Sequence, residues 1–172
     1  YLTKLGALNG EYIRSLGADE LADRILAYAA EFGQLRDVTD QQVDLLRAAV
    51  PLVQERLALL SEAVPKLSYL LTADAELVIE ADALAKAGPD AAAVIAAART
   101  ALAELGEWHH DAIQSTLRTA LVEGLGIERK FAFGPVGVAV TGSTVSPPLF
   151  GSMELLGRDS TLARIDKLAG LL

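Results

Sequence analysis

A span rich in glycine and proline, residues 131–148, constrains the fold of this chain more than any other part. Its helix-breaking residues are Gly134, Pro135, Gly137, Gly142, Pro147 and Pro148. At this density they disfavour a helix, because glycine costs ordering entropy and proline removes a backbone hydrogen bond. The apolar residues between them suit a strand, but the sequence has no second strand-like run to pair with them. We therefore predict an irregular loop that is held between helices and presents its backbone amides.

The rest of the chain shows the apolar spacing that is typical of amphipathic helices. One helix is expected to open near Asp19 and to end at Gly33, and the next to kink or restart at Pro51. A short helix is expected over 75–87, and the Gly88-Pro89 dipeptide that follows favours a boundary. We predict an all-α, two-subdomain helical bundle that divides into residues 1–88 and 89–172.

Composition limits the location and the chemistry of the chain. There is no cysteine, which excludes disulfides, thiol nucleophiles and thiolate metal sites. No apolar run reaches the roughly 18 residues of a membrane span, and no signal-peptide pattern opens the sequence. We therefore expect a cytoplasmic protein. The net charge is −8, yet residues 118–167 hold 6 basic and 5 acidic residues, so the region around the predicted loop is the least acidic.

Catalytic motifs are absent from the sequence. His109 and His110 are neighbours, and neighbouring side chains on a helix point in different directions, so we expect no metal site. The acidic pair Asp19 and Glu20 opens a helix, where carboxylates complement the helix dipole. There is no phosphate-binding loop with its lysine and no nucleophile elbow. A backbone nest for phosphate over residues 137–142 remains a weaker alternative.

Two segments at opposite ends of the chain carry a resemblance to a known family. Residues 4–14 (KLGALNGEYIR) are similar to the Lys-Leu-x-Trp-Leu-Asn-x-x-Tyr-Ile segment that follows the catalytic half of bacterial glutamyl-tRNA synthetases. Residues 138–142 (VAVTG), 146–150 (SPPLF) and 155–158 (LLGR) resemble the C-terminal end of the same enzymes. Residues 55–60 and 108–123 also follow the order and spacing of the family. The chain thus resembles the anticodon-binding region of these synthetases.

This resemblance implies a helical region that binds tRNA and is separate from its catalytic half. The start of the chain would belong to the region that contacts the tRNA stem. The expected partners are the anticodon loop of glutamate tRNA and the catalytic half of the same chain, with no membrane contact and a monomeric state. Because the catalytic motifs of the family are missing, we expect no enzyme activity and no cofactor here. ATP and Mg²⁺ would belong to the parent ligase.

The resemblance also implies a set of tRNA-binding residues. Arg56 matches the family arginine that reads the last anticodon base. Its fork of donors suits the acceptors of cytosine, whereas uracil would bring a ring N–H against an N–H. A surface in the predicted loop is expected to face the first anticodon bases through backbone amides and apolar contact, and basic residues are expected to meet phosphates. The full set is Arg56, Arg118, Arg129, Lys130, Thr141, Gly142, Ser146, Pro147 and Leu149.

Two positions depart from the family pattern, and one property argues against RNA. Ala7 stands where the family often has tryptophan, and Gly137 replaces an arginine that would be a base-contacting donor. The net charge of −8 opposes phosphate binding, which normally supplies much of the affinity for RNA. A helical protein–protein interaction module without RNA binding is therefore the competing class. The sequence leaves open whether glutamine tRNA is also accepted.

Overall fold

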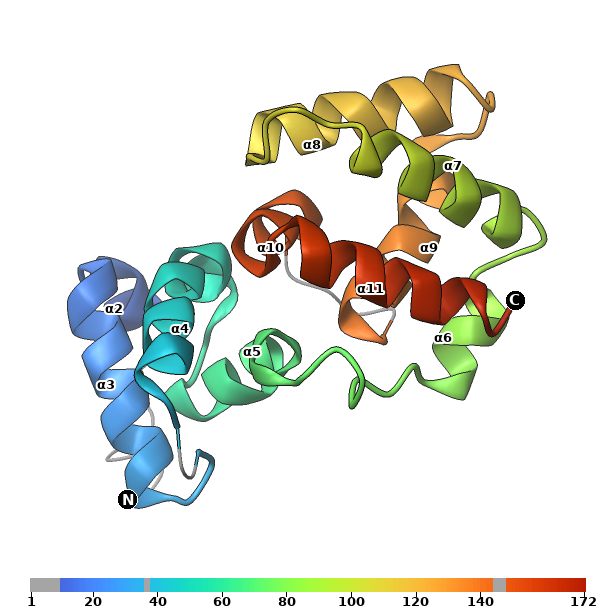
Figure 1. Ribbon diagram of the computed structural model, residues 1–172. Coiled ribbons are helices and arrows are strands. Elements are labelled where there is room, and N and C mark those ends of the chain that lie inside the picture. The colour runs from blue at the N-terminus through green and yellow to red at the C-terminus, as the bar shows by residue number, and fades with distance from the viewer. Residues whose placement is uncertain (1–9, 36–37, 144–147) are drawn as a thin grey trace. The chain divides into compact units, whose positions relative to one another are not determined.

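The computed structural model describes residues 10–35, 38–143 and 148–172, and its elements are shown in Figure 1. Within these residues the regular elements are all helical, which confirms the all-α prediction. No helix in the described ranges is long and apolar enough to cross a membrane. The elements are α2 (Gly10–Ser15), α3 (Ala18–Glu31), α4 (Asp40–Val53), η1 (Gln54–Arg56), η2 (Leu60–Glu62), α5 (Ala63–Leu71), α6 (Ala81–Lys86), α7 (Ala91–Ala103), α8 (His110–Leu117), the π-helix η3 (Arg118–Glu123), α9 (Arg129–Thr141), α10 (Leu149–Leu156) and α11 (Arg158–Ala169).

The chain divides into two compact units, Tyr1–Leu71 and Thr72–Leu172. This division lies upstream of the boundary that we expected after Gly88. The reason is that the carbonyls of Thr72 and Leu77 accept hydrogen bonds from side chains of α11, which belongs to the second unit. We refer to these parts as the first unit and the second unit.

The first unit packs α3 and α5 against α4. The buried faces carry Leu21 and Ile25 on α3, and Leu46 and Val50 on α4, as the apolar spacing predicted. The helix α3 ends before Gly33, which has a positive φ of 70°. A capping box begins α4, because the Thr39 hydroxyl accepts from the Gln42 amide at 3.1 Å and the Gln42 side chain accepts from the Thr39 amide at 3.0 Å. Local signals therefore place these helix ends correctly.

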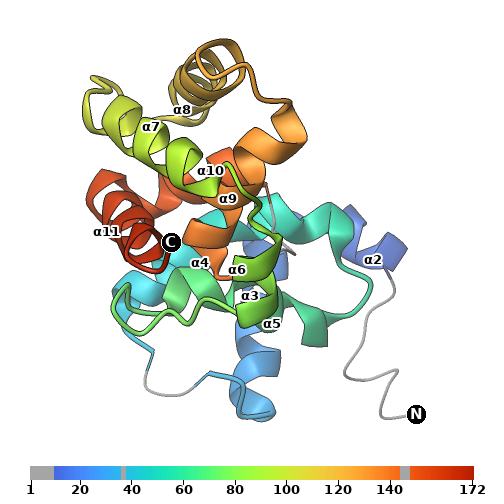
Figure 2. The same ribbon diagram turned by 90° about the vertical axis from the view of Figure 1, so that its right-hand side faces the viewer.

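The second unit is built around α9, and here the loop prediction is wrong for residues 131–141. These residues continue a helix that begins at Arg129 and ends at Thr141, with Pro135 inside it. The helix packs against α7, α10, α11 and η3, as Figures 1 and 2 show. All residues from Pro135 to Val140 are buried. The predicted irregular span therefore becomes a central helix of its unit.

Burial explains why α9 forms despite its composition. An interior proline costs about 3 kcal/mol, and an interior glycine about 1 kcal/mol relative to alanine. Complete burial of a valine side chain contributes about 1.5 to 3 kcal/mol. Val136, Val138 and Val140 are at most 3% exposed, so their burial offsets these costs. The apolar pattern that resembled a strand is in fact that of a helix covered on several sides.

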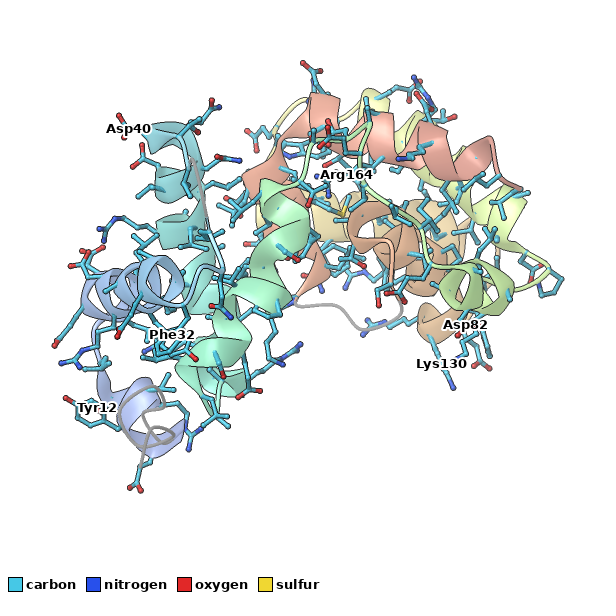
Figure 3. All side chains as sticks on the ribbon, turned by 90° about the horizontal axis from the view of Figure 1, so that it is seen from below. Tyr12, Phe32, Asp40, Asp82, Lys130 and Arg164 are labelled. Carbon is cyan, nitrogen blue, oxygen red and sulfur yellow. The ribbon has the colours of Figure 1, made fainter. Side chains whose placement is uncertain are left out.

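The segment over residues 72–80, which we expected to be partly helical, is held in a non-helical form by α11. The helix in this region begins only at Ala81. The guanidinium of Arg164 donates to the Asp74 carboxylate at 2.7 Å, to the Thr72 carbonyl at 2.8 Å and to the Val140 carbonyl at 2.7 Å. Arg164 is only 1% exposed, and Figure 3 shows its side chain among the elements of the second unit.

One turn later on α11, Lys167 continues this contact. Its ammonium donates to the carbonyls of Ala75, at 3.0 Å, and Leu77. The hydroxyl of Ser160 donates to the Asp74 carboxylate at 2.5 Å. These bonds fix the direction of the carbonyls of Ala75 and Leu77 toward α11. Long-range hydrogen bonds therefore override the local helix propensity of residues 75–80.

Replacing Arg164 by methionine is expected to destabilise the second unit by about 3 kcal/mol, because Asp74 and two carbonyls lose their buried partner. Urea unfolding monitored through the fluorescence of Trp108, the chain's single tryptophan, measures this loss. Arg99→Met is the matched control, since Arg99 pairs with Asp166 at 2.7 Å but is 47% exposed. It should cost less than about 1 kcal/mol. Equal losses in the two variants would contradict a dominant role for Arg164.

Candidate nucleic-acid interface

Arg56 lies in the short turn η1 that follows α4. Proline at position 51 does not end α4, which continues to Val53 before the backbone changes to the tighter η1 turn. The side-chain amide of Gln54 fixes this turn by donating to the carbonyls of Ile13 at 3.0 Å and Leu16 at 2.8 Å. The turn is therefore anchored to α2 and to the residue that follows α2.

The side chain of Arg56 is exposed, while its surroundings hold the backbone in place. Val53 and Leu57 are each 1% exposed, so they anchor the turn in the core of the first unit. After the turn, the carboxylate of Glu62 accepts from the amides of Ala58 at 3.0 Å and Leu59 at 2.6 Å. An anchored backbone with an exposed arginine side chain is suited to reading a base, because little backbone entropy remains to be lost on binding.

Three of the predicted basic residues lie in the second unit, two at the start of α9 and one on η3. Arg129 and Lys130 occupy the first turn of α9, Arg118 begins η3, and all three are exposed. Figure 3 shows the Lys130 side chain pointing away from the helices of its unit. The ammonium of Lys130 lies 5.7 Å from the ring centroid of Phe131, whose side chain is 57% exposed. The sequence interpretation counted Phe131 among the apolar residues of a loop and missed its exposure.

A specific turn leads the chain from η3 to these residues. The π-helix ends at Gly124, where a Cβ atom would lie only 2.5 Å from the Ala120 carbonyl oxygen. Gly126 then takes a positive φ of 69°, and the Ile127 amide donates back to the Leu121 carbonyl at 3.5 Å. Glycine is the residue that adopts such a conformation without steric cost. The turn ends at Glu128, and α9 begins at the next residue, Arg129.

Among the described residues of the second unit, the predicted site residues Thr141 and Gly142 lie at the opposite end of α9, and Leu149 lies at the start of α10. Thr141 is half-buried, and its hydroxyl lies 2.8 Å from the Gly137 carbonyl. Leu149, also half-buried, begins α10. Ser146 and Pro147 lie outside the described residues. Gly137, which replaces the family arginine, is buried within α9.

Gly142 has a structural role at this end of α9. It ends the helix with φ 77°, and its amide donates to the Val138 carbonyl at 2.7 Å. Its carbonyl accepts from the Glu80 amide at 2.8 Å, and a Cβ atom here would lie 2.3 Å from the Val78 carbonyl oxygen. Both backbone groups of Gly142 therefore already have partners within the protein.

The helical form of α9 separates the two groups of site residues. At about 1.5 Å per residue, its first and last residues are roughly 18 Å apart along the axis. Arg129 and Lys130 therefore do not share one compact surface with Thr141 and Leu149. The second unit carries a basic end of α9, which we define as Arg129, Lys130 and Phe131, and a separate junction between α9 and α10.

The histidine pair has local partners. The His109 ring accepts from the Ala112 amide at 3.3 Å and caps α8, while the His110 ring lies 3.0 Å from the Asp111 carboxylate. No group of three or more potential metal-binding side chains occurs among the residues that the structure describes.

Comparison with known proteins identifies similar sequences and folds. The family described as "Anticodon binding domain" matches residues 11–169. The glutamate–tRNA ligase of Acidothermus cellulolyticus is 52% identical over 172 residues, covering 99% of this chain and 34% of the relative. That of Cutibacterium acnes is 50% identical over 171 residues, covering 96% and 34%. The chain therefore spans about a third of the length of these relatives.

A solved structure supports the same fold. The glutamate tRNA ligase from Elizabethkingia meningosepticum superposes with a TM-score of 0.76 at 18% sequence identity. The superposition covers 95% of this chain and 31% of that protein.

Substituting Gly142 by alanine is expected to destabilise the second unit by about 3 kcal/mol or more, because the added methyl group collides with the Val78 carbonyl and φ stays positive. Gly126→Ala is the matched control, since its φ is also positive but nothing lies within 4 Å of its Cβ position. It should cost only about 1 kcal/mol. Urea unfolding followed by Trp108 fluorescence compares the two, and equal losses would show that the contact with Val78 is unimportant.

Proposed function

We propose that this chain, which belongs to the anticodon binding domain family, recognises the anticodon loop of glutamate tRNA. The observation that carries this proposal is the exposed Arg56 on its anchored turn. The names of the most similar relatives support the choice of glutamate tRNA.

The chemical step is assigned to the remainder of such a ligase. This chain covers about a third of its relatives, and it matches the anticodon binding domain. We therefore assign no catalytic residue and no cofactor to it. In this proposal, the catalytic half of the same protein attaches glutamate and uses ATP and Mg²⁺. The whole protein acts as a monomer in the cytoplasm.

Arg56 would act on the last base of the anticodon. Glutamate codons begin with G and glutamine codons with C, so that base is cytosine in glutamate tRNA and guanine in glutamine tRNA. Cytosine offers the acceptors O2 and N3 to a guanidinium, whereas the same edge of guanine carries two N–H donor groups. A guanidinium that donates only would therefore favour cytosine. A well-formed contact of this kind contributes about 1 to 3 kcal/mol of discrimination.

Phosphate contacts would come mainly from the basic end of α9. Arg129 and Lys130 are exposed at this end, and Arg118 is exposed on η3. All three side chains can therefore approach the RNA backbone from solvent. Because the whole chain carries a net charge of −8, we expect these contacts alone to bind weakly. Contacts from the catalytic half would raise the effective concentration of this region at the anticodon.

The junction between α9 and α10 is proposed to face the first anticodon bases. Leu149 offers half-buried apolar surface there, and Thr141, whose hydroxyl is bonded within the protein, belongs to the same stretch of chain as Gly142, Ser146 and Pro147. Because both backbone groups of Gly142 are bonded within the protein, its part would be to shape the junction.

Replacing Arg56 by alanine should narrow the preference for glutamate tRNA over glutamine tRNA by about 5- to 150-fold, equivalent to about 1 to 3 kcal/mol. The expected cause is the loss of donors to the last anticodon base. The affinities of both tRNAs are measured with the full-length protein at fixed salt, and circular dichroism checks the fold.

Arg24→Ala is the matched control, because Arg24 is another partly exposed arginine of the first unit, 40% exposed and paired with Glu20. Its removal should leave the ratio of the two affinities unchanged. Arg56→Lys tests the shape of the donor group, since lysine keeps the charge but lacks the planar fork. If Arg56→Ala leaves the ratio as in the wild type, Arg56 does not read the base.

A further inference from the structure

We propose that Phe131 is a stacking platform for an unpaired base of the bound RNA, with Lys130 holding a phosphate beside it. This inference rests on the proposed function and adds a nucleotide-binding residue to it. It concerns the basic end of α9, which the base-reading role of Arg56 does not use.

The exposure of Phe131 is the first observation. Its side chain is 57% exposed, although a phenyl ring is normally placed in a core, where its burial stabilises the protein. The Phe131 backbone amide donates to the Glu128 carbonyl at 2.9 Å, a hydrogen bond that any residue at this position can make. An aromatic ring on a helix suits stacking, because the backbone is already ordered and only two side-chain torsions remain to be fixed on binding.

The charges beside the ring indicate which partner fits it. Lys130 places its ammonium 5.7 Å from the ring centroid, while Arg129 and the acid Glu128 are the other charged neighbours in the sequence. A nucleotide combines a flat aromatic surface with an anionic phosphate, which matches a ring beside a cation. An apolar protein surface would instead desolvate Lys130 without compensation. The chemistry therefore favours single-stranded RNA.

Phe32 in the first unit shows what an exposed phenylalanine looks like without these features. It is 54% exposed, which is close to the value for Phe131. Its ring packs against Tyr28 at a centroid distance of 4.5 Å, and the residue before it is Glu31. Phe32 thus already has an aromatic partner. The residue before it is an acid, whereas the residue before Phe131 is a lysine. This makes Phe32 a matched control for exposure alone.

The test compares variants of both phenylalanines in the full-length protein. The probe is a synthetic RNA hairpin with the anticodon stem and loop of glutamate tRNA, and its affinity is measured at fixed salt. Phe131→Leu should weaken binding about 5- to 100-fold, because leucine lacks a π-face. Phe131→Tyr should bind like the wild type, and so should Phe32→Leu. Leucine is a better helix former than phenylalanine, so α9 should persist, and circular dichroism verifies it.

A second series identifies the stacked base. Hairpins that carry an abasic nucleotide at one loop position each are measured with the wild type and Phe131→Leu. At one position the two proteins should bind equally, because the base that stacks on the ring is gone. If the wild type and Phe131→Leu differ in affinity for the abasic hairpins at every loop position, the proposal is wrong. It is also wrong if Phe131→Leu binds the intact hairpin as tightly as the wild type does.

The outcome is separable from that of the proposed function. Stacking tolerates any base, so Phe131→Leu should weaken glutamate and glutamine tRNAs by the same factor, unlike Arg56→Ala. If the wild type binds the hairpin and Phe131→Leu binds equally well, only the stacking proposal fails. If the wild type does not bind the hairpin or the tRNA, the proposed function fails as well.

Discussion

The buried guanidinium of Arg164 is the interaction on which the arrangement of the second unit depends. It bonds to Asp74, to Thr72 and to Val140, so one side chain joins α11 to the end of α9 and to the segment before α6. A buried cation is costly unless its donors are satisfied, and here three groups from two distant parts of the chain satisfy them. The same contacts hold residues 72–80 against the end of α9, where the Glu80 amide donates to Gly142.

This arrangement has a direct consequence for the proposed recognition of RNA. Since α9 is a rigid helix, its two ends present different chemistry in fixed positions. The first turn carries exposed cations and an exposed aromatic ring, while the end at Gly142 is closed by contacts with Val78 and Glu80. A flexible loop would lose backbone entropy on binding RNA. An anchored helix end and the anchored η1 turn would lose much less. Rigid placement offsets part of what an acidic protein lacks in electrostatic attraction.

The distribution of charge is consistent with a domain that selects RNA more than it attracts it. The net charge is −8, so the average field repels an RNA backbone, and attraction is confined to local groups such as Arg129 and Lys130. In the first unit, Arg47 on α4 pairs with Asp23 on α3, and this hydrogen bond raises the pKa of Arg47. Recognition would then depend on a few exposed groups, with much of the affinity supplied by the rest of the protein.

The sequence by itself determined the helical class, the end of α3 near Gly33 and the family resemblance that the comparisons confirm. These features depend on residues close together in the chain. Tertiary structure alone decided that Pro135 lies inside a helix, that residues 75–80 are not helical and that Phe131 is exposed. Each of these outcomes depends on burial or on hydrogen bonds between distant residues, such as Arg164 with Thr72. Such energies exceed local propensities, so a local pattern cannot reveal them.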